Sequence, residues 1–165
     1  PTHPDTWMGP VVRPRNAQAI RAQVDAALAA GARDLVPPTT PDTPGSASVQ
    51  PRILLDVDHQ MTVMREETFG PVVGVMRVRS DAEAIAHIND SAFGLTASVW
   101  SADADAAHAM SAALDVGTVF LNRCDYLDPA LPWVGVKASG RGVTLSSLGY
   151  AALTRPQSLH FRMRN

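Results

Sequence analysis

Residues 71–122 read PVVGVMRVRSDAEAIAHINDSAFGLTASVWSADADAAHAMSAALDVGTVFLN, an alternation of short apolar runs with alanine-rich segments. The apolar runs are rich in β-branched residues and predict strands at 71–78, 95–101 and 117–122. The alanine-rich segments predict helices at 81–89 and 102–115. Ser80 and Glu83 are spaced as a capping box at the start of the first helix. Because strands and helices that alternate in this way form βαβ units, the predicted fold class is α/β, with a mostly parallel sheet and flanking helices.

The chain on either side of this stretch adds further elements. A helix is predicted at about 14–30, because Ala17, Ile20, Val24 and Leu28 recur at helical spacing. The other segments predict a surface loop at 37–46, a strand at 52–57, a short helix near 146–152 and an alternating run at 158–164. The runs at 52–57 and 71–78 are almost continuously apolar, which favours burial on both faces of a sheet.

Composition limits the classes of function. The chain has 165 residues, of which 45% are hydrophobic and 18% charged, and this indicates an ordinary soluble domain in one compact unit. A net charge of −2 does not indicate the excess of basic residues that binding to nucleic acid or an anionic membrane requires. No apolar run approaches the roughly 18 residues of a membrane span. One cysteine, Cys124, excludes an internal disulfide, and a cytoplasmic location is the default expectation.

Two irregular segments are candidates for a ligand site, since sheets of this class bind ligands near strand ends. The first is the corner REETFGPVV at 65–73, where two carboxylates precede an aromatic residue, a glycine and a proline. The second runs from 122 to 142, after the predicted strand at 117–122. Neither has the order of a phosphate-binding loop. These residues alone indicate a soluble α/β domain with a possible site.

Four motifs, taken in order, resemble the C-terminal part of the NAD(P)-dependent aldehyde dehydrogenase superfamily. They are EETFGPVV at 66–73, INDSAFGLTASVWS at 88–101, GTVFLN at 117–122 and PWVGVKASGRG at 132–142. The resemblance implies a partial catalytic domain at 1–152 and an oligomerisation arm at 153–165. It also implies that the nucleophilic cysteine, the general base and most of the cofactor domain lie upstream of this chain, which would then be about the last third of an enzyme.

The resemblance gives the acidic corner a role with NAD or NADP. Glu67 is expected to accept hydrogen bonds from the nicotinamide-ribose hydroxyls, and Phe69 to give the nicotinamide an apolar surface. Gly70 permits close backbone approach, and Pro71 favours an extended conformation in the residue before it. The alternative is a solvated acidic pair followed by a core phenylalanine. Glu66 is expected to be structural.

The second segment is expected to line the aldehyde tunnel of the family. Trp133 occupies the place of an aromatic residue in that wall, with Tyr126 and Leu127 as further tunnel candidates. Trp133 would narrow the tunnel or stack on an aromatic substrate, or would simply pack. Asn122 is expected to support the loop that begins there, or to be an ordinary turn residue. Departures from the family pattern after Trp133 weaken any assignment of substrate.

Cys124 is expected to be a passive loop residue, although Arg123 beside it offers a cation that favours a thiolate. The five histidines show no metal-ligand spacing, and no metal site is expected. A hydrolase based on Cys124 is a weaker hypothesis.

The whole protein is therefore expected to oxidise an aldehyde with NAD(P), and this segment is expected to be inactive alone. Residues 158–164 alternate apolar and polar side chains, and by resemblance residues 154–164 lie at or near the interface with another subunit in a homodimer or tetramer. The alternative is a freestanding, non-catalytic binding or assembly module with the same fold.

Overall fold

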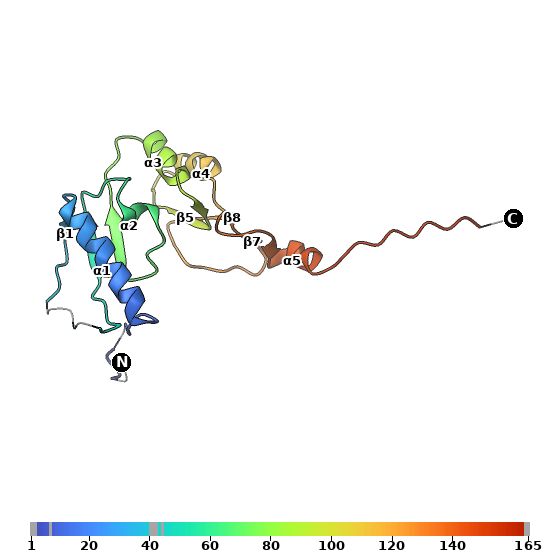
Figure 1. Cartoon of the computed structure of the whole chain (residues 1–165). Coiled ribbons are helices and arrows are strands. Elements are labelled where there is room, and N and C mark those ends of the chain that lie inside the picture. The colour runs from blue at the N-terminus through green and yellow to red at the C-terminus, as the bar shows by residue number, and fades with distance from the viewer. Residues whose placement is uncertain (1–2, 7, 40–42, 44, 164–165) are drawn as a thin grey trace. The chain divides into compact units, whose positions relative to one another are not determined.

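The structure is a computed structural model that describes residues 3–6, 8–39, 43 and 45–163. Its contacts divide the chain into two compact units, Pro1–Arg79 and Ser80–Asn165. Figure 1 shows the elements of both units along the chain. The boundary falls directly before the predicted capping box, inside the stretch whose alternation predicts the fold. A domain boundary between residues 152 and 153 stays a prediction.

The first unit is a three-stranded sheet with two helices. Its elements are α1 (Pro14–Ala29), β1 (Arg33–Asp34), β2 (Arg52–Leu55), α2 (Thr62–Arg65) and β3 (Val72–Val75). The strand order is β1-β2-β3, with β1 antiparallel and β3 parallel to β2. The predicted helix at 14–30 is confirmed, and Pro14 suits its first turn because the missing N–H has no partner there. The strands predicted at 52–57 and 71–78 are present as β2 and β3, and both are shorter than predicted.

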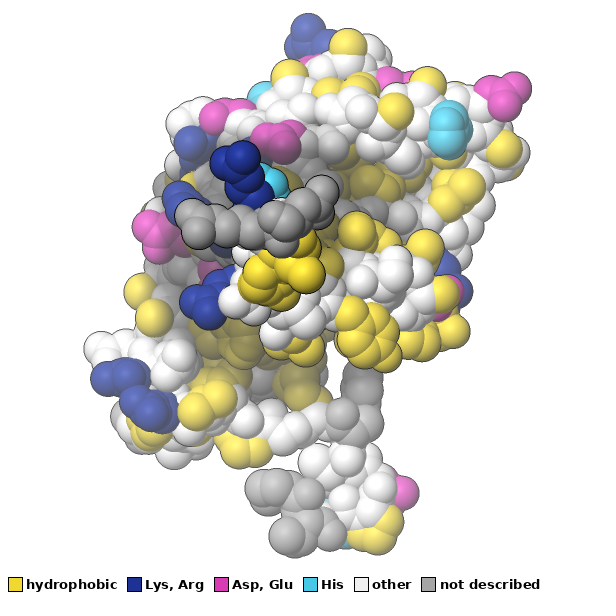
Figure 2. Space-filling view, turned by 90° about the vertical axis from the view of Figure 1, so that its right-hand side faces the viewer, with side chains coloured by type: hydrophobic (Ala, Val, Ile, Leu, Met, Phe, Trp, Pro, Cys, Tyr) yellow, Lys and Arg dark blue, Asp and Glu magenta, His cyan; other side chains and the backbone are white. Residues whose placement is uncertain are grey.

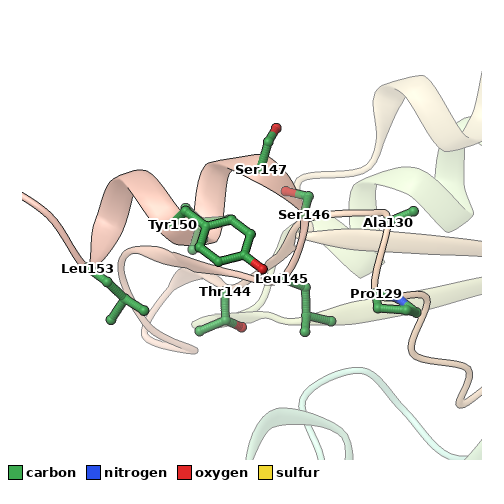
Figure 3. Close-up of a pocket in the computed structure, with 10 residues that line it drawn as sticks. Pro129, Ala130, Thr144, Leu145, Ser146, Ser147, Tyr150 and Leu153 are labelled. Carbon is green, nitrogen blue, oxygen red and sulfur yellow. The ribbon is translucent and has the colours of Figure 1, made fainter.

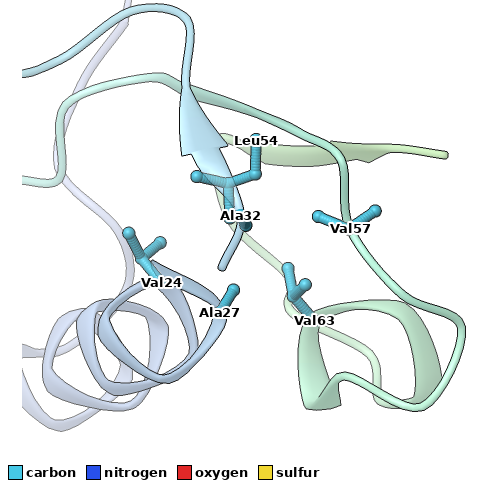
Figure 4. Close-up of a cluster of buried hydrophobic side chains, with 6 residues drawn as sticks. All are labelled: Val24, Ala27, Ala32, Leu54, Val57 and Val63. Carbon is cyan, nitrogen blue, oxygen red and sulfur yellow. The ribbon is translucent and has the colours of Figure 1, made fainter. Parts of the chain in front are cut away.

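One face of α1 supplies much of the core of this unit. Ala17, Ile20, Val24 and Ala27 are buried at successive spacings of three and four residues, as the periodicity predicts. Figure 4 shows Val24 and Ala27 facing Leu54 of β2, with Val57 and Val63 closing the cluster. Burial of each large aliphatic side chain contributes about 1.5–3 kcal/mol. The sheet and α1 therefore depend on each other.

The sheet is not buried on both faces within this unit, and that prediction is wrong for β3. Val73 and Val75 are 52% and 45% exposed, while Val72 and Gly74 face the core side. Alternation of exposed and covered positions is the pattern of a strand covered on one face only. Figure 2 shows hydrophobic side chains at the surface on one face of the molecule.

The second unit contains three pairs of short strands and three helices. Its helices are α3 (Asp81–Asn89), α4 (Ala104–Ala113) and α5 (Ser146–Ala152). Its strands are β4 (Phe93–Gly94), β5 (Thr96–Val99), β6 (Thr118–Leu121), β7 (Trp133–Val134), β8 (Val136–Lys137) and β9 (Val143–Thr144). β5 and β6 are parallel and joined through α4, so the βαβ unit predicted over 95–122 is confirmed. The βαβ unit predicted over 71–101 is not formed, because β3 and β5 belong to different sheets. The pairs β4–β8 and β7–β9 are antiparallel.

Side-chain caps fix the starts of both long helices in this unit. The Ser80 hydroxyl accepts a hydrogen bond from the Glu83 N–H at 3.2 Å, as the capping-box spacing predicts. The Asp103 carboxylate accepts one from the Ala106 N–H at 2.9 Å. Such caps each stabilise a helix by about 0.5–2 kcal/mol. Val99, Ala107 and Leu114 form the buried centre beside them.

After α5, the described residues up to 163 form neither helix nor strand, and Figure 1 shows them as an extended segment. Leu159, Phe161 and Met163 are exposed at alternate positions. Pairing of this segment with another chain stays a prediction, and its last predicted residue, 164, lies outside the described residues.

Two ion pairs border the first sheet, and they differ in burial. The Arg52 guanidinium contacts Oδ2 of Asp34 through Nε and Nη2, with side chains 15% and 9% exposed. The Arg33 Nε donates to Asp56 at 2.7 Å, with side chains 69% and 62% exposed. A buried charge without its partner costs much more than an exposed one.

We therefore expect Asp34→Asn to lower the free energy of unfolding by about 3 kcal/mol or more, because it leaves Arg52 buried without its counter-charge. The matched control is Asp56→Asn, which keeps a residue suited to the positive φ of 57° there and should cost about 1 kcal/mol or less. Urea denaturation followed by circular dichroism measures both. Equal losses in the two variants would contradict this account.

Candidate functional site

The acidic corner begins where α2 ends. The Glu66 N–H donates to the Thr62 carbonyl at 2.9 Å and closes the helix, so the chain then turns outward through Glu67 and Thr68. Phe69 has φ of 46°, which is rare for a bulky residue, and its side chain is 77% exposed. The backbone thus holds an aromatic ring away from the core at a conformational cost of about 1–3 kcal/mol. Sequence reasoning did not foresee this conformation.

Contacts with α1 and β2 hold the corner in place. The Thr68 hydroxyl donates to Oε1 of Gln23 on α1 at 2.8 Å. Gly70 lies against Ile20 so closely that a Cβ would collide with the end of its side chain. The Arg52 N–H donates to the Pro71 carbonyl at 2.9 Å. The predicted role of Gly70 in close packing therefore concerns Ile20 of α1 in this structure.

Glu67 offers its carboxylate to solvent. The side chain is exposed and makes no hydrogen bond or ion pair with any residue in the described part of the chain. An ionised carboxylate is an acceptor with two oxygens, so it is able to receive two hydroxyl donors. Neighbouring Glu67 and Phe69 thus place an available acceptor beside an exposed ring.

Asn122 follows β6 with φ of 51°, a conformation that asparagine tolerates. Its Oδ1 accepts from the Ser101 N–H at 2.9 Å and its Nδ2 donates to the Ser101 carbonyl at 2.8 Å. Both bonds join the end of β6, where the loop begins, to Ser101 after β5. Support of the loop that follows Asn122 stays a prediction.

A pocket of about 220 Å³ lies beside β6 and brings two predicted tunnel residues together. Tyr126 and Trp133 both line it, whereas Leu127 does not and is 58% exposed. Sequence reasoning missed several lining residues, namely Phe120, Arg123, Asp128, Leu131 and Leu145. The Arg123 guanidinium lies over the Tyr126 ring, 3.9 Å from its centroid. Arg123 was considered only as a neighbour of Cys124, which is exposed.

Trp133 is positioned by an unusually close strand contact. Gly117 lies directly before β6 and so close to the Val134 carbonyl that a Cβ on residue 117 would overlap the carbonyl oxygen. Val134 follows Trp133 in β7, which pairs with Val143–Thr144. The absence of a side chain at Gly117 therefore sets where this wall of the pocket lies.

A larger groove of about 460 Å³ borders α5 and was not predicted from the sequence. Figure 3 shows Thr144, Leu145 and Tyr150 along it, with Ser147 pointing away from them. Leu145 and Ser146 both have positive φ, at 61° and 52°, where the chain enters α5.

Among the described residues there is no group of three or more histidine, cysteine, aspartate or glutamate side chains able to hold a metal ion. No helix in the described part of the chain is both long enough and apolar enough to cross a membrane.

Comparison with known proteins identifies the family. The model of the aldehyde dehydrogenase family matches residues 1–159. The chain belongs to the aldehyde dehydrogenase family. The resemblance carried by the four sequence motifs, and the α/β fold class, are thereby confirmed.

Aldehyde dehydrogenases of known sequence and structure cover almost the whole chain. A succinate-semialdehyde dehydrogenase [NADP(+)] from Deinococcus radiodurans is 41% identical over 154 residues, 93% of this chain and 32% of that protein. A betaine aldehyde dehydrogenase from Cereibacter sphaeroides is 38% identical over 142 residues, 86% of this chain and 29% of that protein.

Solved structures of aldehyde dehydrogenases also match this chain. The succinic semialdehyde dehydrogenase of Streptococcus pyogenes in complex with NADP+ has a TM-score of 0.81 and 32% identity, covering 91% of this chain and 33% of that chain. The betaine aldehyde dehydrogenase of Staphylococcus aureus in complex with NAD+ has a TM-score of 0.82 and 32% identity, covering 98% of this chain and 35% of that chain. This chain thus spans about a third of the length of the aldehyde dehydrogenases that it matches.

We expect Gly117→Ala to lower the free energy of unfolding by about 2 kcal/mol, because a backbone carbonyl, unlike a flexible side chain, must move to admit the methyl group. Gly9→Ala is the control, since Gly9 has open space around its missing Cβ and no positive φ. Urea denaturation compares the two variants. A loss no larger than that of the control would show that β7 moves without cost.

Proposed function

We propose that this chain is the part of an NAD(P)-dependent aldehyde dehydrogenase that binds the nicotinamide ribose and forms one wall of the aldehyde tunnel. The observation that carries the proposal is the corner at Glu66–Pro71, which α1 and β2 hold while an unengaged carboxylate and an exposed ring point away from the core. In a member of this family, that arrangement suits a dinucleotide better than it suits a solvated loop.

The residues of the corner fit NAD or NADP by their chemistry. Glu67 accepts hydrogen bonds from the two ribose hydroxyls, which fixes the sugar, and Phe69 covers one side of the nicotinamide ring with an apolar surface. The cofactor supplies the hydride acceptor of the reaction when it is bound. Gly70 and Pro71 contribute through the backbone, because they seat the corner against Ile20 and Arg52. Glu67 and Phe69 are therefore binding residues in this proposal and not proton-transfer groups.

The second unit contributes the tunnel wall. Tyr126 and Trp133 border the substrate there, and Leu127 lies farther along the same loop. Asn122 positions this loop through its two bonds to Ser101. The chain supplies no covalent nucleophile in this proposal, so the aldehyde is attacked by a residue outside it, and Cys124 is a loop residue.

Assembly is the remaining part of the proposal. The segment at 154–164 exposes Leu159, Phe161 and Met163 at alternate positions, which favours pairing with another subunit in a homodimer or tetramer. The alternative function, a freestanding binding or assembly module, differs from an enzyme in the size of the natural polypeptide. Denaturing electrophoresis of source cells, with an antibody to this segment, separates the two: a band near 17.6 kDa would favour the module.

We expect Glu67→Gln, made in the complete enzyme, to weaken NAD(P) binding about tenfold or more, because hydrogen bonds to a charged acceptor contribute roughly 1.5–3 kcal/mol. Glu66→Gln is a matched control, since it removes the same charge from the adjacent exposed position. Isothermal titration of the cofactor measures both. Equal weakening in the two variants would show a general charge effect and would refute the ribose contact.

A further inference from the structure

The pocket beside β6 carries a charged residue that the proposed tunnel wall does not explain. Arg123 lines this pocket together with Tyr126 and Trp133. Within the described residues, its guanidinium has no carboxylate in ion-pair range and donates no hydrogen bond. Arg123 is an exposed residue, and an unpaired guanidinium with five N–H donors at a largely apolar pocket is able to bind an anion.

The position of Arg123 is fixed at both ends. Its backbone carbonyl accepts a hydrogen bond from the Ser98 hydroxyl at 2.9 Å, which ties the residue to β5. Its guanidinium carbon lies over the Tyr126 ring, 3.9 Å from the centroid, and this cation–π contact restrains the side chain. The contact engages the charge without using the five N–H donors, which stay available to a ligand.

Asp128 also lines the pocket and would oppose an anion, but its carboxylate is already engaged. Its Oδ1 accepts a hydrogen bond from the Ala130 N–H at 2.9 Å, and the Leu131 N–H donates to its carbonyl at 3.0 Å. Asp128 thus serves the turn at residues 128–131, and it keeps its negative charge. What distinguishes Arg123 is that its N–H donors have no hydrogen-bond partner among the described residues and face a ligand unengaged.

The two aromatic rings do not make the pocket suitable for a cation. Rings of tyrosine and tryptophan bind quaternary ammonium groups through their faces. Here Arg123 occupies a face of Tyr126 and repels a second positive charge. A neutral aldehyde would leave the guanidinium unpaired, and a carboxylate would neutralise it with a bidentate pair of hydrogen bonds.

We propose that Arg123 selects aldehydes that carry a carboxylate at the end remote from the aldehyde carbon. This inference rests on the proposed function, because it assigns the substrate class of the same tunnel. Arg123 is in this account a specificity residue that touches the substrate, with Tyr126 as the residue that positions it.

The test compares aldehydes of equal chain length whose far end is a methyl group, a carboxylate or a trimethylammonium group. The complete enzyme is expected to prefer the carboxylate in kcat/KM and to disfavour the ammonium. In Arg123→Gln the carboxylate-to-methyl ratio of kcat/KM should fall about tenfold or more, as expected for loss of one charged hydrogen-bonded pair. Arg123→Lys keeps the charge without the planar fork and should give an intermediate ratio.

Arg141→Gln is the control, since Arg141 is an exposed arginine of the same unit that does not line the pocket. Its ratio should equal that of the unmodified enzyme. A ratio unchanged in Arg123→Gln while all three aldehydes are still oxidised would overturn the role of Arg123 and leave the proposed function intact. Oxidation of none of the aldehydes by the unmodified enzyme would overturn the proposed function, and this inference with it.

Discussion

Burial of one face of α1 is the constraint on which the first unit depends. Val24 and Ala27 pack against Leu54 of β2, and the cluster that contains Ile20 packs against Val72 of β3. These contacts fix the rotation of the helix about its own axis. Gln23 lies one turn from Ala27 and is thereby aimed at Thr68. Ile20 on the same helix meets Gly70. The acidic corner thus receives its position from α1 through two contacts, Thr68 with Gln23 and Gly70 with Ile20, which join residues at least 45 positions apart in the chain.

Local signals explain which elements the sequence predicts well. The helix at 14–30 and the cap at Ser80 depend on neighbouring residues, so the pattern and the structure agree within a residue or two. Two-residue strands such as β1 and β7 have no periodicity to detect, and their pairing depends on partners far along the chain. Burial of β3 was overestimated because an apolar run does not reveal which of its faces has a partner within the unit.

The candidate site shows the same limit at single residues. A positive φ near the corner would be sought at Gly70, because glycine adopts it without strain. Gly70 instead serves the close approach of Ile20, and Phe69 takes the positive φ. Likewise, residue type and the family pattern suggested Tyr126 and Trp133, but only the folded loop places Arg123 over Tyr126 in the same pocket. Contacts between side chains in loops are set by tertiary geometry, which no spacing rule encodes.

The cost of the left-handed conformations distinguishes two kinds of position in this chain. Asn122 and Asp125 have positive φ at little cost, because short polar side chains tolerate it. Phe69 and Leu145 have it at a higher cost, which the cores of their units must offset. At Phe69 a glycine would satisfy the backbone more easily but would carry no ring. The packing of the first unit therefore maintains a strained conformation that keeps an aromatic ring exposed, two residues from the Glu67 carboxylate. That is the placement which the proposed contact with a flat nicotinamide ring requires.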